Sequence, residues 1–305
     1  MYNNGGFLGE FKNAFNRPNY SHVQLIIINV VMFVLIGLLN VIMNLAQTQV
    51  ELLSYIALPA NFDVFITRPW TIMTYMFTHV GIWHILMNML ILYWFGRILI
   101  NFLGSDKLIA SYVLGGLAGG VLYMVAYNFI PYFAQAVDVS ILFGASAGVL
   151  AVVAAAATLV PNYTVVLMFI GPVKIKYIAL FYVVLSFLQS TGSNAGGEIA
   201  HLGGALMGFV YIKQIQKGTD LGNWIIRIMY FFKRIFTSSP KIKVSYKRTK
   251  TSRKSKAQSS GGSSPVSSKK SDQAEIDAIL DKISEKGYDS LSKEEKQKLF
   301  NASNN

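Results

Sequence analysis

Residues 23–46 of the chain read VQLIIINVVMFVLIGLLNVIMNLA and contain no charged side chain. A helix that spans a membrane needs about 20 consecutive, mostly apolar residues. This stretch therefore predicts a membrane-spanning helix. It is not expected to be a cleaved signal peptide, because 22 residues precede it and it is longer than the apolar segment of such peptides.

The composition of the whole chain agrees with a membrane protein. Apolar residues make up 53% of the 305 residues and charged residues only 14%, and the mean hydropathy is +0.42. Soluble globular domains carry about 25% charged residues, so this class is excluded. The chain has no cysteine, which excludes disulfides, cysteine nucleophiles and thiolate metal sites.

Five further apolar runs follow the first one, so we expect six crossings of the membrane. The predicted spans are 23–46, 82–103, 107–130, 141–160, 173–190 and 198–216. Lys and Arg side chains lie beside the span ends on one side of the membrane. The loops on the other side contain Arg68 as their only basic residue. Because basic loops are cytoplasmic, the predicted fold is an all-α membrane protein, a bundle of six transmembrane helices with both termini and a tail in the cytoplasm.

The chain is expected to divide into a membrane core and a basic tail. The predicted segments are a cytoplasmic N-terminal segment at 1–22, a six-span core at 23–217, a basic amphipathic interfacial segment at 218–236, a disordered basic linker at 237–271 and a small helical hairpin at 272–305. Ten Lys and Arg side chains and no acid lie between 237 and 270. These charges predict attraction to anionic lipid, whereas nucleic-acid binding is not expected, since aromatic residues do not interleave with them. The hairpin, which has a capping box at Ser292 and Glu295, is expected to bind a protein partner of unknown identity.

Polar side chains inside membrane spans are costly, so each one is a functional candidate. His84 and Asn88 lie four residues apart and therefore on one face of the second span. Ser146 lies in the sequence FGASAGVL of the fourth span, and His201 lies in AHLGGALMG of the sixth. His22, at the cytoplasmic start of the first span, is interpreted as an interfacial residue without a catalytic role.

Ser146 and His201 are expected to meet in the outer leaflet. If the fourth span begins near Ile141 and the sixth near Glu198, the two side chains lie about 7 and about 5 Å below the outer boundary. Close contact of the two backbones would bring the imidazole within hydrogen-bond reach of the hydroxyl. The small residues that would permit this contact are Gly144, Ala147, Gly148 and Ala151 on the fourth span and Gly204 and Gly208 on the sixth.

These residue types suit nucleophilic catalysis. A serine hydroxyl needs a base to become a nucleophile, and a nearby histidine typically contributes about 10² to 10⁴ in rate. His84 and Asn88 offer the N–H donors that would stabilise an oxyanion. No Asp is placed to orient His201, which favours a Ser-His dyad over a triad. Glu198 lies one turn before His201; its expected role is to complement the helix dipole, with a role as third member as the alternative. No cofactor and no metal are predicted.

The motifs taken together resemble the rhomboid family of intramembrane serine proteases. The resemblance covers roughly residues 20–217 and rests on RPW at 68–70, His84-x-x-x-Asn88, GASA around Ser146 and AHLGG around His201. It implies a six-span rhomboid-like fold with a cytoplasmic extension like that of some bacterial members. The positive-inside charge and the absence of a signal peptide suit a bacterial inner membrane, with the membrane of an organelle as the alternative.

The resemblance also implies an activity and a role for each site residue. Ser146 would be the nucleophile and His201 the general base, and His84 and Asn88 would stabilise the oxyanion. The implied reaction is hydrolysis of peptide bonds in transmembrane substrates near the outer membrane face, with water reaching the site through an outward-opening cavity.

The sequence departs from the family pattern at three places. Ala147 follows the nucleophile where the family has glycine, and Leu150 replaces an aromatic residue that stacks on the base. In the outer loop, Arg68 precedes Trp70, whereas the family has Trp first. His79 fits the family pattern and is expected to organise the first outer loop rather than to act chemically.

Two other functions compete with a protease. A rhomboid-like pseudoprotease would bind transmembrane helices without cleaving them, although it would gain nothing from keeping both Ser146 and His201. A transporter is disfavoured, because no inverted repeat and no broken helix at the membrane midplane is apparent in the sequence.

Overall fold

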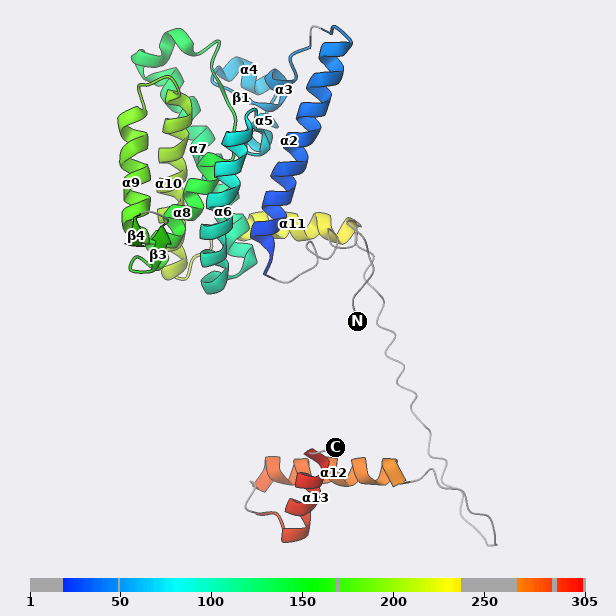
Figure 1. Cartoon of the computed structure of the whole chain (residues 1–305). Coiled ribbons are helices and arrows are strands. Elements are labelled where there is room, and N and C mark those ends of the chain that lie inside the picture. The colour runs from blue at the N-terminus through cyan, green and yellow to red at the C-terminus, as the bar shows by residue number, and fades with distance from the viewer. Residues whose placement is uncertain (1–18, 49, 168–169, 237–267, 287–289, 304–305) are drawn as a thin grey trace. The chain divides into compact units, whose positions relative to one another are not determined.

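The structure is a computed structural model that describes residues 19–48, 50–167, 170–236, 268–286 and 290–303 (Figure 1). The chain divides into two compact units, Met1–Pro240 and Lys241–Asn305. Most of the predicted N-terminal segment 1–22 and of the predicted linker 237–271 lies outside the described residues.

Six long helices build the first unit, and each lies close to one predicted span. They are α2 (Ser21–Leu45), α6 (Ile82–Leu103), α7 (Ser105–Phe129), α8 (Ser146–Leu159), α9 (Ile175–Gln189) and α10 (Ala195–Gln216). Within the described residues, α2, α6 and α7 are long and apolar enough to cross a membrane, and α8 and α9 are shorter apolar helices. The predicted all-α bundle of membrane helices is therefore confirmed.

Helix α8 forms the centre of the bundle. Its sequence, SAGVLAVVAAAATL, is apolar on every face, and all residues from Ala147 to Ala157 are buried. A helix that is apolar all round is stable only when other helices surround it. Helices α6, α7, α9 and α10 pack around α8, whereas α2 lies at the side of the bundle (Figure 1) and exposes most of its apolar side chains.

The predicted fourth span begins too early. Strand β2 (Ile141–Leu142) pairs in antiparallel register with β1 (Leu58–Pro59), and α8 begins only at Ser146. Gly144 has φ of +125°, a conformation that interrupts a helix and that L-residues with a Cβ avoid. The depth counted from Ile141 is therefore wrong, because Ser146 is the first residue of its helix.

The predicted first outer loop, which connects α2 to α6, is structured. It contains α3 (Leu52–Ile56), α4 (Phe62–Thr67), α5 (Thr71–Thr74) and the 3₁₀ helix η1 (Tyr75–Phe77). The Arg68 guanidinium donates to the carbonyl of Ser54 at 2.7 Å and lies 4.3 Å from the Tyr55 ring centre. Trp70 Nε1 donates to the carbonyl of Tyr55 at 2.8 Å. The Arg-Pro-Trp sequence thus folds the loop onto itself.

The opposite end of the bundle carries a hairpin and a surface helix. Strands β3 (Thr164–Leu167) and β4 (Gly171–Lys174) connect α8 to α9. Helix α11 (Asn223–Phe236) runs across the bundle ends, close to the start of α2 (Figure 1). Ile225 and Ile226 are buried, and the Tyr230 hydroxyl donates to Asp106 at 3.3 Å. A further short 3₁₀ helix, η2 (Pro131–Ala136), follows α7 at the other end.

The second unit is a pair of helices, α12 (Ser268–Lys286) and α13 (Lys293–Ser303). Lys282 pairs with Glu295 at 2.9 Å across the two helices. The capping box predicted at the start of α13 is confirmed, because Ser292 N donates to Glu295 Oε2 at 2.7 Å and Glu295 N donates to Ser292 Oγ at 3.3 Å. Helix α12 begins four residues before the predicted hairpin.

Candidate active site

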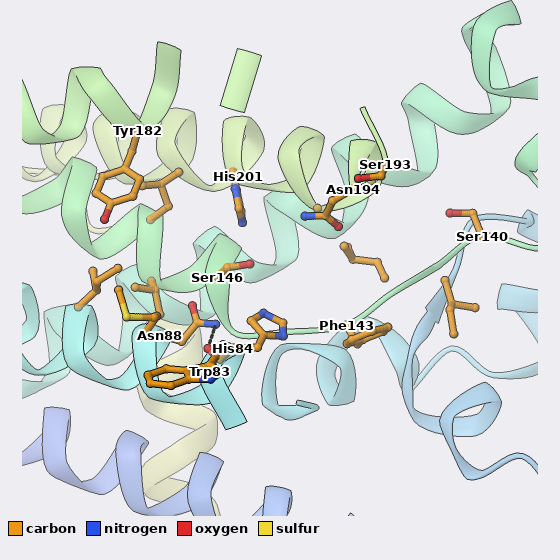
Figure 2. A pocket seen from close by; sticks show the side chains of 18 of the residues that line it. Trp83, His84, Asn88, Ser140, Phe143, Ser146, Tyr182, Ser193, Asn194 and His201 are labelled. Atoms are coloured by element: carbon orange, nitrogen blue, oxygen red, sulfur yellow. Dashed lines mark hydrogen bonds between the residues drawn. The ribbon is translucent and has the colours of Figure 1, made fainter. Parts of the chain in front are cut away.

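All four predicted site residues line one cavity of about 570 Å³ (Figure 2). His84 and Asn88 come from α6, Ser146 from α8 and His201 from α10. In Figure 2 the His201 ring and the Ser146 hydroxyl project into the cavity from facing helices, and His84 and Asn88 lie on the other side of Ser146. The cavity therefore joins side chains that lie up to 117 positions apart (201 minus 84) in the sequence.

The segment before Ser146 is held in place by the first outer loop. Gly144 N donates to the carbonyl of Tyr75 at 2.9 Å, and Ala145 N donates to His79 Nε2 at 3.4 Å. Ser146 then begins α8. The first N–H groups of a helix have no partner within it and carry a partial positive charge, so the nucleophile candidate lies where an anion would be stabilised.

Gly144 also determines how close His84 approaches Ser146. A methyl group on Gly144 would lie 2.7 Å from His84 Cε1, 2.9 Å from His84 Nε2 and 3.8 Å from Ser146 Oγ. The imidazole therefore packs against the bare backbone beside the serine, and any side chain at position 144 would displace it.

Within the described residues, one of the two amide hydrogens of Asn88 makes no hydrogen bond. Its Nδ2 donates to the carbonyl of His84, one turn earlier, at 2.9 Å. This bond fixes the amide while leaving the second N–H of Nδ2, which suits the predicted donor role.

The predicted close contact between the fourth and sixth spans is confirmed. A methyl group on Gly204 would collide with the carbonyl oxygen of Ala147, and one on Gly208 would collide with that of Ala151. His201 lies one turn before Gly204 and is thus carried to the beginning of α8. No hydrogen bond joins Ser146 to His201 in the described part of the chain, as is common for catalytic pairs without a bound substrate.

Ala147 causes no disruption at the place where the family has glycine. The methyl group of Ala147 is buried and faces Gly119 of α7, where a further methyl would approach it to 2.6 Å. A glycine on the neighbouring helix thus provides the space that the alanine needs. Leu150 is buried and lines the cavity, and the aromatic Tyr182 of α9 lines it as well.

His79 supports the site from outside the membrane spans. It is buried, its ring centre lies 5.1 Å from that of His84 in an edge-on arrangement, and its Nε2 accepts the Ala145 N–H. Burial, with a smaller contribution from His84, lowers the pKa of His79 to about 4. The neutral ring that results is the form that can accept this hydrogen bond. His22 lies away from the cavity and is buried, with its ring centre 5.4 Å from that of Tyr93.

Three polar side chains lie near His201. Sequence reasoning missed Ser186 and Asn194 and gave Glu198 a role beside His201 only as the alternative. Ser186 Oγ lies 3.1 Å from His201 Nδ1, and Glu198 Oε2 lies at the same distance from it. Asn194, at the start of α10, lines the cavity (Figure 2). Ser186 is a polar residue inside the fifth predicted span, and this was a signal that could have identified it.

Comparison with known proteins agrees with this geometry. The model of the Rhomboid domain matches residues 67–217, which contain all four site residues. The chain belongs to the rhomboid family. A family of unknown function, DUF6576, matches residues 267–305, which contain α12 and α13.

Curated relatives of this rhomboid protein carry mitochondrial names. The chain is 31% identical over 158 residues to RHOMBOID-like protein 12, mitochondrial, of Arabidopsis thaliana, covering 48% of this chain and 47% of the relative. It is 30% identical over 165 residues to Rhomboid protein 1, mitochondrial, of Saccharomyces cerevisiae, covering 51% of this chain and 44% of the relative. The chain thus spans less than half the length of these rhomboid relatives.

Proposed function

We propose that the chain is an intramembrane serine endopeptidase in which Ser146 is the nucleophile and His201 the general base. The observation that carries this proposal is the convergence of a hydroxyl, two imidazoles and an amide from three helices on one cavity. Membership of the rhomboid family supports it.

The reaction would proceed through an acyl-enzyme. Ser146 Oγ attacks the peptide carbonyl carbon while its proton passes to His201 Nε2. The C–N bond then breaks, and the leaving amine takes the proton from His201. A water molecule, deprotonated by His201, attacks the ester carbon and releases the carboxylic acid and the free serine.

The oxyanion would be stabilised from two sides. Asn88 can donate its second Nδ2 hydrogen, and the His84 imidazole can donate from beside Gly144. The unpaired N–H groups at the beginning of α8 add to this stabilisation.

An apolar groove beside the cavity suits a transmembrane helix as substrate. The groove, about 370 Å³, lies between α6 and α9 and shares Met87, Ile91 and Tyr182 with the cavity. Its other lining side chains are mostly large and apolar. An apolar substrate segment that moves from lipid into the groove would stay in apolar surroundings. It would therefore reach Ser146 without crossing a polar barrier.

The membrane contacts and the compartment are parts of the same proposal. Helix α11 exposes Trp224, Phe231 and Phe232 and carries Arg227, Lys233 and Arg234, which suits an anionic membrane surface. The bacterial inner membrane stays a prediction, whereas the curated relatives are named mitochondrial. A protein partner of the C-terminal helices also stays a prediction.

Cleavage of a model transmembrane substrate in proteoliposomes tests the proposal. The wild-type chain should release two fragments, and Ser146→Ala should reduce the rate by about 10³-fold or more. Ser54→Ala is the matched control, since Ser54 is a half-buried serine of the loop between α2 and α6 whose hydroxyl bonds only to the Glu51 carbonyl in the described residues; it should cleave like the wild type. Cleavage by Ser146→Ala at the wild-type rate, or substrate binding by the wild type without cleavage, would overturn the proposal.

A further inference from the structure

Side chains from two helices lie within hydrogen-bond distance of His201 Nδ1, the ring nitrogen that does not face Ser146 in the proposed reaction. Glu198 Oε2, on the same helix, and Ser186 Oγ, on α9, each lie 3.1 Å from His201 Nδ1. The Ser186 side chain is buried, and the Glu198 side chain is only 12% exposed. A carboxylate at this depth is costly, so it needs a compensating role.

The helix dipole accounts for only part of this arrangement. Glu198 lies in the first turn of α10, where a negative charge is favourable. A residue with that role alone would be expected to accept hydrogen bonds from the free N–H groups of the turn. Among the described residues, no backbone N–H donates to the Glu198 carboxylate. The carboxylate instead bonds to the His201 ring and interacts with the side chains of Ser186 and Asn194.

The chemistry of the partners fixes the protonation of the ring. An ionised carboxylate can only accept a hydrogen bond, so His201 Nδ1 carries the hydrogen and donates it to Glu198. His201 Nε2 is then unprotonated and can accept the proton of Ser146. The Ser186 hydroxyl can donate to the same carboxylate and so anchor it from the neighbouring helix.

We propose that Glu198 and Ser186 are positioning residues that hold His201 in its Nδ1–H tautomer, so that the site operates as Ser146–His201–Glu198 rather than as a dyad. The proposal rests on the proposed protease function. In this arrangement the negative charge of the Glu198 carboxylate stabilises the imidazolium that forms when His201 takes the proton from Ser146.

Glu198→Gln should be the most damaging substitution at this position. The glutamine amide can donate to Nδ1 and thereby favour the wrong tautomer. In a serine protease triad, the corresponding substitution lowers kcat by about 10⁴-fold. We expect kcat to fall by about 10²-fold or more, with KM within about twofold of the wild type. Glu198→Asp should recover part of the rate, and Glu51→Gln, which removes an exposed carboxylate of the outer loop, should leave kcat unchanged.

Ser186→Ala should have a smaller effect, because it keeps the carboxylate and removes one neutral hydrogen bond. We expect kcat to fall about 3- to 10-fold. Ser190→Ala is the control on the same segment, since its exposed hydroxyl bonds to the Phe187 carbonyl at 2.7 Å, away from the site.

Nitrogen-15 NMR of histidine-labelled protein reports the tautomer of His201 independently of any cleavage assay. The His201 signals, assigned by their loss in His201→Ala, should report Nδ1–H in the wild type and a shift toward Nε2–H in Glu198→Gln. An unchanged tautomer in Glu198→Gln, or a kcat within threefold of the wild type, would overturn the proposal. If Glu198→Gln does not fold, Glu198→Asp and Ser186→Ala decide by the same two measurements. A wild type that cleaves nothing would refute the protease function instead, while the NMR result would still decide the tautomer.

Discussion

The two sides of the active site are packed differently. On one side, α8 and α10 are in contact through backbone atoms, because Gly204 and Gly208 face the carbonyls of Ala147 and Ala151. On the other side, the boundary between α6 and α9 is an apolar groove of about 370 Å³. Within α9, only Ile175, Ala179 and Ser186 are buried.

This difference separates the parts of the site that must be rigid from the part that a substrate can enter. The backbone contact fixes the positions of Ser146 and His201 to within the tolerance of packed atoms. The groove adjoins the same cavity, and the large side chains that line the groove can rotate. We therefore expect severe effects for changes at the glycine contact and at the α6 donors, and mild effects for changes in the groove.

The largest effects are expected at the two donors of α6. His84→Ala or Asn88→Ala should lower kcat by about 10² to 10³, or about 3 to 4 kcal/mol of transition-state stabilisation, since each removes one oxyanion donor. Initial rates of substrate cleavage measure the loss. Leu86→Ala, on the same helix, 48% exposed and outside the linings of the cavity and the groove, is the control and should retain near wild-type kcat. A loss below fivefold at both donors would contradict their role.

The glycine contact should be next in sensitivity. Gly204→Ala introduces a methyl that collides with the Ala147 carbonyl, so α10 must move away from α8. Overpacking of this kind costs about 1–3 kcal/mol, and cleavage should fall with it because His201 moves. Gly37→Ala on α2 is the matched control, since a methyl there meets no atom within 4 Å; it should be neutral or stabilise by up to about 1 kcal/mol. Equal unfolding temperatures for the two variants would contradict the account.

A polar cluster fixes the far end of α10 and should contribute less. Lys107 of α7 pairs with Asp220, which also accepts from the Tyr211 hydroxyl at 3.1 Å and from Gly222 N at 3.0 Å. Burial alone would raise the pKa of Asp220, but these partners together lower it below its ordinary value of 3.8. The carboxylate therefore stabilises the fold above that value, and the stabilisation is lost as the pH falls through the lowered pKa.

Thermal unfolding of Asp220→Asn tests this cluster. The variant should lose about 1 kcal/mol or less of stability at pH 7, and the difference from the wild type should shrink below pH 3.8. Asp63→Asn, in the exposed first turn of α4, is the control. A difference that grows as the pH falls would contradict this sign.

The smallest effect on stability is expected in the groove. Phe181 lines it and is 62% exposed. Phe181→Ala should change the unfolding free energy by no more than about 0.5 kcal/mol and should raise KM for a transmembrane substrate without lowering kcat. Unfolding and cleavage measurements on one preparation check both expectations. A loss of stability as large as that of Gly204→Ala would remove the distinction between the two sides.

Local sequence patterns predicted most of the fold because a membrane span is a local property. Apolar runs located the six helices, and the small residues on two of them predicted the contact at Gly204. The start of α8 could not be predicted, since it depends on pairing between Ile141–Leu142 and Leu58–Pro59, which lie about 80 residues apart.

The environment of His201 depends on tertiary structure in the same way. Ser146, His201, His84 and Asn88 carry recognisable spacings, and the structure places all four around one cavity. Ser186 belongs to no spaced motif and is marked only by its polarity inside an apolar span; it reaches His201 because α9 packs beside α10. The space for the Ala147 methyl likewise comes from Gly119 on a third helix.

The central claim is that the contact between α8 and α10 places His201 where it activates Ser146. Labelling with a fluorophosphonate probe, followed by mass spectrometry of the modified peptide, tests it most directly. We expect the wild type to be labelled at Ser146 and His201→Ala to slow this labelling by about 10²-fold or more, with the unfolding temperature maintained. Labelling of Ser146 at equal rates in the two proteins, or no labelling of Ser146 in the folded wild type, would contradict it.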